Sequence, residues 1–305
     1  DQPRSRGLGD VYKRQESSDE LIALTQASQV TQECENGAVG DNGMLGAGCV
    51  DPTDFHRSAL LIGLKEEQTT GYNPIKLGVI ASTDTHVSNP GNVKESDWAG
   101  SVVGEGTPVE RLQKGILTSG IDGNPGGLAG IWAEQNTRDS IFNALLRKEV
   151  FGTSGPRIRP RFFAGWNINE NLCNVNEMIS DAYASGVPMG GDLMPSRSKS
   201  FPKFLMHAAK DPEGLNIESI QLVKGWIDEE GNMNTKVIPV LSEIGGAESL
   251  CKVYTDTEFE NSLPSYYYMR VVEPKSPRWH TYDCERLSED DRPDVCTNET
   301  YPSFI

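Results

Sequence analysis

The fold prediction for this chain starts from one stretch, Lys76-Leu-Gly-Val-Ile-Ala-Ser-Thr-Asp-Thr-His86. Its apolar, β-branched run, Leu77 to Ala81, follows the turn signal Asn73-Pro74 and predicts one buried strand. Asp84 and His86 come directly after this run. Because side chains alternate along an extended segment, these two point the same way and make a suitable pair of metal ligands. The alternative is a turn in which Asp84 caps backbone amides and His86 is an ordinary polar residue.

The segments on either side predict an alternation of helices and strands. A helix starts at Asp51-Pro-Thr-Asp54, with Asp51 as its N-cap, and runs to about Gln68. A second strand is expected from Gly126 to Ala133, and a second helix opens at Asn136-Thr137. This alternation is typical of a parallel sheet or an α/β barrel, whose catalytic groups sit at the C-terminal strand ends. The long polar loop from Ser88 to Asn124 is placed to form a lid or substrate wall.

The second half of the chain predicts a run of strands with a single helix, Leu172 to Ala184. Strands after βα units indicate an appended β-sandwich-like module. We therefore expect an α/β part at residues 16–156 and a β-rich module at residues 157–305, and we exclude residues 1–15, which resemble a translated adapter at the end of a metagenomic reading frame. The expected strands are Arg157–Trp166, Lys203–Ala209, Ser219–Ile227, Thr235–Leu241 and Tyr266–Val272.

Composition limits the classes of partner. The chain has 305 residues and a formal net charge of −16, which argues against a nucleic-acid backbone as the main ligand because phosphate contacts need clustered Lys and Arg. The charge does not exclude a small phosphorylated substrate, since a bound dication inverts the local field. The sequence has no run of 18 apolar residues, and so no predicted membrane span. With four histidines, the chain can give few imidazoles to a metal site.

The six cysteines form no Cys-x-x-Cys pair, so a zinc ribbon has no support. Cys284 and Cys296 are close in a polar tail, and Cys34 and Cys49 flank a glycine-rich loop. Both pairs are candidates for local disulfides, which would indicate an exported protein. Unpaired, partly buried thiols are the alternative, and spacing does not fix connectivity.

Three arginines, Arg157, Arg159 and Arg161, alternate on one face of an expected strand. Arg157 is a candidate for binding an anionic substrate. A solvated face is the preferred interpretation of the stripe.

The run Leu77 to His86 resembles the last metal-binding motif of a family of uncharacterised proteins, the domain of unknown function 3604. That family belongs to the polymerase-and-histidinol-phosphatase (PHP) superfamily of metal-dependent phosphoesterases. The resemblance extends from about residue 20 to the end of the chain. Further segments agree with the family in order: Gly126–Glu134, Thr137-Arg138, Phe151–Ile158, Phe162–Trp166, Gly186–Leu193 and Gln221–Trp226.

The resemblance implies the C-terminal portion of a distorted PHP-type (β/α) barrel that holds two or three divalent ions (Zn, Mn or Fe) in the intact protein. A metal-activated water would attack a phosphoester. Asp84 and His86 match the final motif, and the family likeness makes Glu33 a further candidate, although a solvated strand-end glutamate is the preferred interpretation. The His-x-His motif that begins the family's site does not occur in this chain. We therefore expect a fragment that binds metal weakly and has no turnover.

Two alternative functions stay open. The intact protein could hydrolyse a different bond, such as an ester, amide or carbamate, because a metal hydroxide is not intrinsically selective. Alternatively, it is an exported binding protein with a degenerate metal site, in which the β-rich half does the work. In either case the expected partner is a small molecule, and a periplasmic or secreted location is favoured slightly over a cytoplasmic one.

Overall fold

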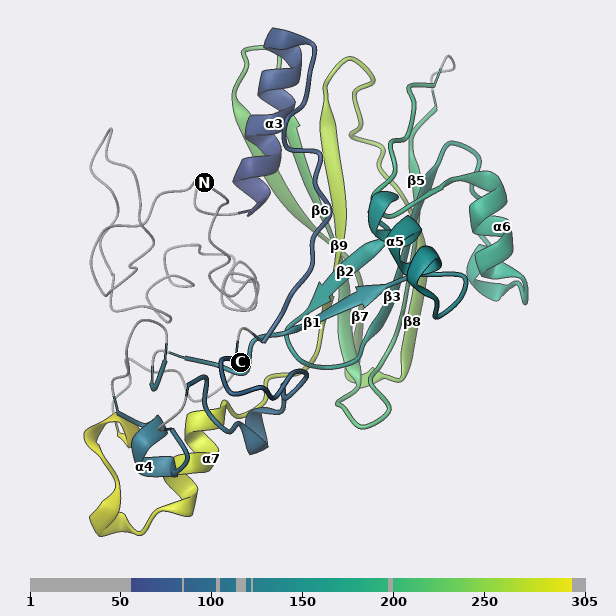
Figure 1. Cartoon of the computed structure of the whole chain (residues 1–305). Coiled ribbons are helices and arrows are strands. Elements are labelled where there is room, and N and C mark those ends of the chain that lie inside the picture. The colour runs from purple at the N-terminus through teal and green to yellow at the C-terminus, as the bar shows by residue number, and fades with distance from the viewer. Residues whose placement is uncertain are drawn as a thin grey trace.

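The computed structural model of the chain describes residues 56–83, 85–102, 105–113, 119–121, 123–196 and 200–297. These residues form a mixed, strand-rich structure with three antiparallel sheets (Figure 1), and none of the described sheets closes into a barrel. The helices are α3 (His56–Thr70), α4 (Pro108–Arg111), α5 (Arg138–Leu146), α6 (Met178–Ser185) and α7 (Trp279–Arg286), with short 3₁₀ turns η3 (Glu95–Asp97), η4 (Leu172–Asn174), η5 (Glu289–Asp291) and η6 (Asp294–Cys296).

Two of the sheets form a sandwich. The first has the order β4-β3-β5-β8 and the second the order β7-β6-β9, while β1 and β2 make a separate pair. The strands are β1 (Leu128–Ile131), β2 (Val150–Thr153), β3 (Arg159–Gly165), β4 (Val187–Pro188), β5 (Lys203–Ala209), β6 (Ile217–Ile227), β7 (Met233–Ala247), β8 (Ser249–Thr255) and β9 (Ser265–Val272).

Side-chain alternation along β5 builds the core between the two sheets. Phe204 and Met206 face the other sheet and pack in one buried cluster with Ile220 and Leu222 of β6. Leu205, between them in sequence, faces the opposite way and belongs to a second cluster. Because neighbouring side chains of a strand point to opposite faces, β5 is buried on both sides. The continuous apolar run Phe204-Leu-Met206 is the sequence sign of that burial.

A helical layer covers each outer face of the sandwich. On the four-stranded sheet, α6 packs through Ala182 against Phe163 and Leu205, and the Cys173–Cys251 disulfide ties η4 to β8. On the three-stranded sheet, α3 packs through two leucines against Ile227. The result is four layers, helix, sheet, sheet and helix, of which Figure 1 shows both helical layers.

The β1–β2 pair lies against the edge of the sandwich and is linked to it by Arg161. The Arg161 guanidinium lies 3.3 Å from the centre of the Trp132 ring. It also bonds the Tyr183 hydroxyl at 3.3 Å, and Tyr183 donates to the buried Glu149 carboxylate. The sequence analysis preferred a solvated face for Arg161, and this is wrong, because Arg161 makes these contacts. It fixes the β1–β2 pair to β3 and α6.

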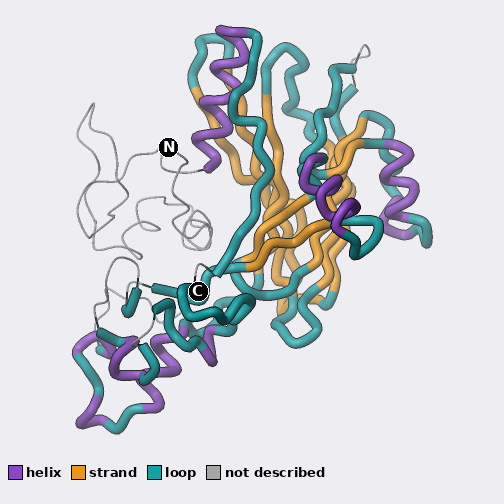
Figure 2. The backbone as a smooth tube through the Cα atoms, in the orientation of Figure 1, coloured by secondary structure: helices purple, strands orange, loops and turns teal. Residues whose placement is uncertain are grey.

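A small lobe lies apart from the sheets and contains α4 and α7 (Figure 2). Its core packs Trp98 against Trp279 with ring centroids 4.3 Å apart. A buried ion pair crosses it, since Arg111 bonds both carboxylate oxygens of Asp283 at 2.7 and 3.0 Å. The described parts of the predicted long loop from Ser88 to Asn124 thus pack against α7, about 170 residues later in the chain.

Several sequence predictions are confirmed. The mixed, strand-rich class is correct, the expected strand Lys203–Ala209 has the bounds of β5, and Thr137 caps α5 through its side chain. The Cys284–Cys296 disulfide is present, whereas Cys34 and Cys49 lie outside the described residues. The Cys173–Cys251 bridge was not predicted, because it joins cysteines 78 positions apart whose proximity depends on the sheet register.

Two predictions were wrong. Leu77 to Ala81 is not a strand, and the run is not buried as a unit: Leu77 is 64% exposed and Ile80 is 44% exposed. Within the run only Ala81 is buried, and its side chain lies against Gly152 of β2. The parallel βα arrangement is also absent from the described residues, since β1 and β2 pair antiparallel although α5 lies between them in sequence.

The two disulfides should differ in their contribution to stability. The Cys173–Cys251 bridge closes a loop of 78 positions and the Cys284–Cys296 bridge a loop of 12. Chain entropy then predicts a loss of about 4.5 kcal/mol for Cys173→Ala with Cys251→Ala, against about 2.8 kcal/mol for Cys284→Ala with Cys296→Ala. Urea unfolding of the two double variants measures both values. Equal losses would show that loop entropy does not govern these bridges.

Candidate functional site

The segment before the Asp84-Thr-His86 motif is held against the β1–β2 pair. The Gly127 N–H donates to the Ser82 carbonyl at 2.9 Å, and the Lys148 ammonium donates to the Lys76 carbonyl at 3.3 Å. A side chain at Gly127 would have its Cβ 2.0 Å from the Thr153 carbonyl oxygen, so the close approach at this point requires glycine. The β1–β2 pair and the residues next to it thus fix where residues 76–82 lie.

Of the predicted site residues, His86 and Arg157 are in the described part of the chain. Asp84 and Glu33 lie outside it, so their predicted roles stay predictions. His86 is exposed, and its backbone N–H donates to the Ser101 carbonyl at 2.7 Å. Among the described residues, no group of three or more His, Cys, Asp or Glu side chains is arranged to hold a metal ion.

The other histidines occupy different surroundings. His56 begins α3, where burial lowers its pKa. His207 on β5 lies with Nε2 3.0 Å from the Ser249 hydroxyl oxygen, and its pKa is lowered by burial first and then by the charges of Arg161 and Arg159. His280 is buried beside Trp279 in α7. These three do not come together with His86.

A cavity of about 1480 Å³ lies where the two sheets of the sandwich diverge. It is lined by β3 and β4 of one sheet, by β9 of the other, by α3 and by the segment just before the Asp84-Thr-His86 motif. Its interior is largely apolar and aromatic. The residues that give this character include Phe162, Phe204, Phe259, Tyr267, Met269 and Val271.

One end of this cavity carries an acidic pair, Asp211 and Glu273, beside Arg157. Asp211 is buried and accepts from the backbone N–H groups of Arg157 at 2.7 Å and Glu213 at 3.0 Å. Burial alone would raise the pKa of Asp211, but these two N–H groups, aided by the charges of Arg157 and Lys94, lower it below its ordinary value. Asp211 is therefore a carboxylate at neutral pH.

Glu273 follows β9, and its pKa is shifted in the direction opposite to that of Asp211. Burial, and then the neighbouring Asp211 carboxylate, raise the pKa of Glu273 to about 7, while Lys210 opposes the shift. Its Oε1 is buried and has no hydrogen-bond partner among the described residues. One carboxylate and one carboxylic acid with separated pKa values, in a cavity, are a common feature of ligand and catalytic sites.

Sequence reasoning missed Asp211 and Glu273. The available signal was Asp211-Pro-Glu-Gly214, which predicts a turn in which the Asp side chain bonds its own backbone two residues later. That bond is present, but nothing local shows that Glu273 faces the same turn, since the two are 62 positions apart. Arg157 was a candidate for binding an anionic substrate, with a solvated face as the preferred interpretation; its side chain is exposed and lines the cavity beside this pair.

Comparison with known proteins identifies the family. The sequence model described as "Protein of unknown function (DUF3604)" matches residues 46–243 and 240–304. The chain belongs to the DUF3604 family. No curated protein and no solved structure matches it. None of the helices in the described ranges of this DUF3604 chain is both long enough and apolar enough to cross a membrane.

The raised pKa of Glu273 predicts a pH dependence of stability. A carboxyl whose folded pKa lies above its ordinary value stabilises the fold fully at low pH, and the contribution disappears as the pH rises through about 7. Between about pH 5 and pH 8 the wild-type protein should therefore lose unfolding free energy that Glu273→Gln keeps. Urea unfolding at both pH values tests this. Glu213→Gln, in the same turn but exposed, is the control, and parallel behaviour of the wild type and Glu273→Gln would contradict the assignment.

Proposed function

We propose that the intact protein is a metal-dependent hydrolase of the PHP type and that this chain is the C-terminal portion of its catalytic domain with the following β-sandwich. The observation that carries the proposal is the Asp84-Thr-His86 motif in a DUF3604 chain, placed directly after a segment that the β1–β2 pair holds in position. The exposed imidazole of His86 is accessible to an ion. Its backbone is fixed by the hydrogen bond to Ser101.

The described residues do not make a complete metal site. Asp84 and His86 are two donors, and a zinc ion needs about four ligands, three of them from protein in a catalytic site. The proposal therefore assigns the remaining ligands to residues outside the described part of the protein. A divalent ion at such a site supplies a Lewis acid and lowers the pKa of bound water. The role of this chain is to hold one carboxylate and one imidazole at the site.

We further propose a phosphoester as the substrate, with an ester, amide or carbamate as the alternative. The support for a phosphoester is the superfamily likeness of the motif. Substrate profiling discriminates these bonds, since a metal hydroxide accepts several electrophiles. The two disulfides in the described residues support an oxidising compartment, so we propose a periplasmic or secreted location.

The proposal is tested on the natural gene product that includes the sequence upstream of this chain. Asp84→Ala with His86→Ala should reduce metal affinity by roughly tenfold or more, because even outer-shell changes cost 10- to 100-fold. It should also abolish Mn²⁺-dependent cleavage of a generic phosphodiester. Metal content by mass spectrometry and initial rates are the two measurements. His56→Ala, which changes a histidine in α3, is the matched control.

Two results would contradict the proposal. Unchanged metal content in the double variant would remove Asp84 and His86 from the metal site. Cleavage by the present chain alone would show that its residues suffice, against the expectation that it binds metal weakly and has no turnover.

A further inference from the structure

The large cavity has one charged end and an apolar body. At the charged end lie Arg157, Asp211 and Glu273, with Lys275 beside them in the lining. The body runs along β3 and β9, whose inward residues Phe162, Met269 and Val271 belong to the sandwich core. A site of this form suits an amphiphile with its polar head at one end.

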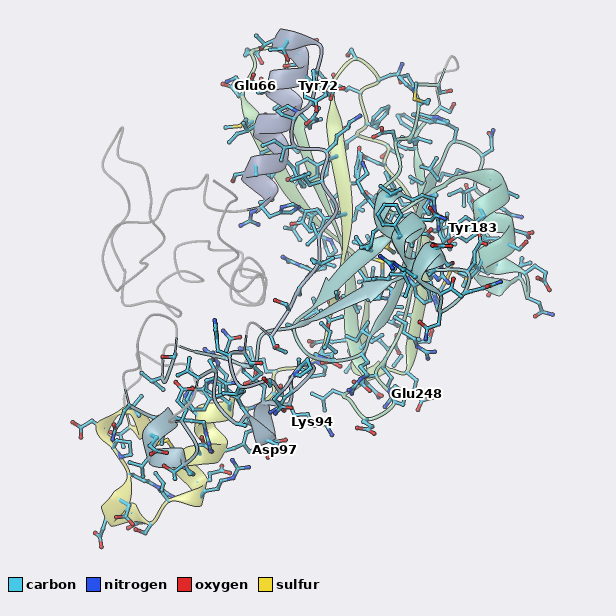
Figure 3. All side chains as sticks on the ribbon, in the orientation of Figure 1. Glu66, Tyr72, Lys94, Asp97, Tyr183 and Glu248 are labelled. Atoms are coloured by element: carbon cyan, nitrogen blue, oxygen red, sulfur yellow. A yellow bond between two sulfur atoms is a disulfide. The ribbon has the colours of Figure 1, made fainter. Side chains whose placement is uncertain are left out.

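The Arg157 guanidinium, at the charged end of the cavity, has no direct ion pair among the described residues. Both oxygens of Asp211 accept backbone N–H groups. The Arg157 guanidinium is close enough to lower the pKa of Asp211, but it makes no hydrogen bond or salt bridge among the described residues. Its side chain is exposed. By contrast, the ammonium of Lys94, which Figure 3 labels, pairs with the Glu213 carboxylate at 3.2 Å.

Glu273 supplies a carboxyl whose Oε1 has no hydrogen-bond partner within the part of the chain that the structure describes. The Glu273 carboxyl lines the cavity, so a ligand atom that bonds it is stabilised there. In its protonated form the carboxyl donates a hydrogen bond. The partner it suits best is an anionic oxygen, which the Arg157 guanidinium also favours.

We propose that this cavity binds a small amphiphilic carboxylate, with its head between Arg157 and Glu273 and its apolar body along β3 and β9. The volume of about 1480 Å³ accepts a long alkyl chain or a polycyclic body. His86 does not line this cavity, and binding needs no metal ion. The inference therefore holds whether or not the protein is a hydrolase.

Binding of this ligand should weaken as the pH rises through 7. The groups that face Glu273 are Asp211 and Lys210, Lys275 follows two residues later in the cavity lining, and Arg157, Glu213 and Lys94 surround Asp211. Burial and the Asp211 carboxylate raise the pKa of Glu273 to about 7. When the Glu273 carboxyl ionises, it no longer donates a hydrogen bond to the ligand's carboxylate, and its negative charge repels that carboxylate. The protonated fraction falls about tenfold between about pH 6 and pH 8, and the affinity should fall with it.

The test is isothermal titration calorimetry with decanoate, a monomeric ten-carbon carboxylate, in the presence of EDTA. The wild-type chain should bind decanoate about tenfold more tightly at pH 6 than at pH 8. Glu273→Gln should bind with an affinity that is the same at both pH values. Arg157→Ala should weaken binding by about tenfold or more, because it removes a charged hydrogen bond and keeps the backbone N–H that Asp211 needs.

Arg159→Ala is the matched control, since Arg159 is an exposed arginine two residues away that does not line the cavity. It should bind decanoate as the wild type does. Butyrate, which has the head without the body, should not bind measurably. Decanoate binding that is absent, insensitive to Arg157→Ala or equally lost in Arg159→Ala would overturn the inference. So would preferential binding of decyltrimethylammonium, which carries the opposite charge on the same chain.

Discussion

The structure depends on the face-to-face packing of two antiparallel sheets, and β5 and β6 are its centre. Phe204 and Met206 of β5 meet Ile220 and Leu222 of β6, and all four are almost completely buried. Each such side chain contributes about 1.5–3 kcal/mol by leaving water. The sheets are joined covalently along one side, where β7 and β8 are separated only by Glu248 (Figure 3). The other links between the sheets, residues 210–216 and 256–264, are longer, and both line the cavity beside β3 and β9.

Two acidic side chains in the sandwich, Asp256 and Glu273, differ in whether the protein supplies all their hydrogen-bond partners. Just after β8, the Asp256 carboxylate accepts from Lys224 of β6 and from the Tyr267 hydroxyl of β9, each at 2.7 Å. That cluster is complete, so it stabilises the fold without needing a ligand. At the open side, Glu273 keeps one buried oxygen without a partner among the described residues. An incomplete cluster beside a cavity is where a ligand can supply the missing bond.

Sequence reasoning predicted five strands of the β-rich half, because their signals are local, and missed β8. Apolar and β-branched composition along β3, β5, β6 and β9 and the turn at residues 228–232 can be recognised within a few residues. The run Leu77 to Ala81 failed for the same reason. Apolar composition predicts that a strand can form, but pairing and burial depend on neighbours far away in the chain. In the described structure the segment lies beside β2, and Leu77 and Ile80 stay exposed.

The candidate site was predictable only in part. Asp84 and His86 were proposed from a motif, and Arg157 was a candidate from its place on an expected strand, although β3 begins two residues later. Asp211 and Glu273 were not, because a turn and a strand end 62 positions apart become a site only through the sandwich. The Cys173–Cys251 bridge depends on tertiary structure in the same way. Chemistry that depends on register and layer packing is therefore the part that a single sequence does not reveal.

Residue-resolved amide hydrogen exchange along β9 tests the open side of the sandwich most directly. In an antiparallel pair, alternate N–H groups of an edge strand bond its neighbour and the others point away. Since β9 pairs with β6 alone among the described strands, we expect protection to alternate from Tyr266 to Val271. Uniform protection of all these amides would contradict the account, because it would mean that another element covers β9 and fills the cavity.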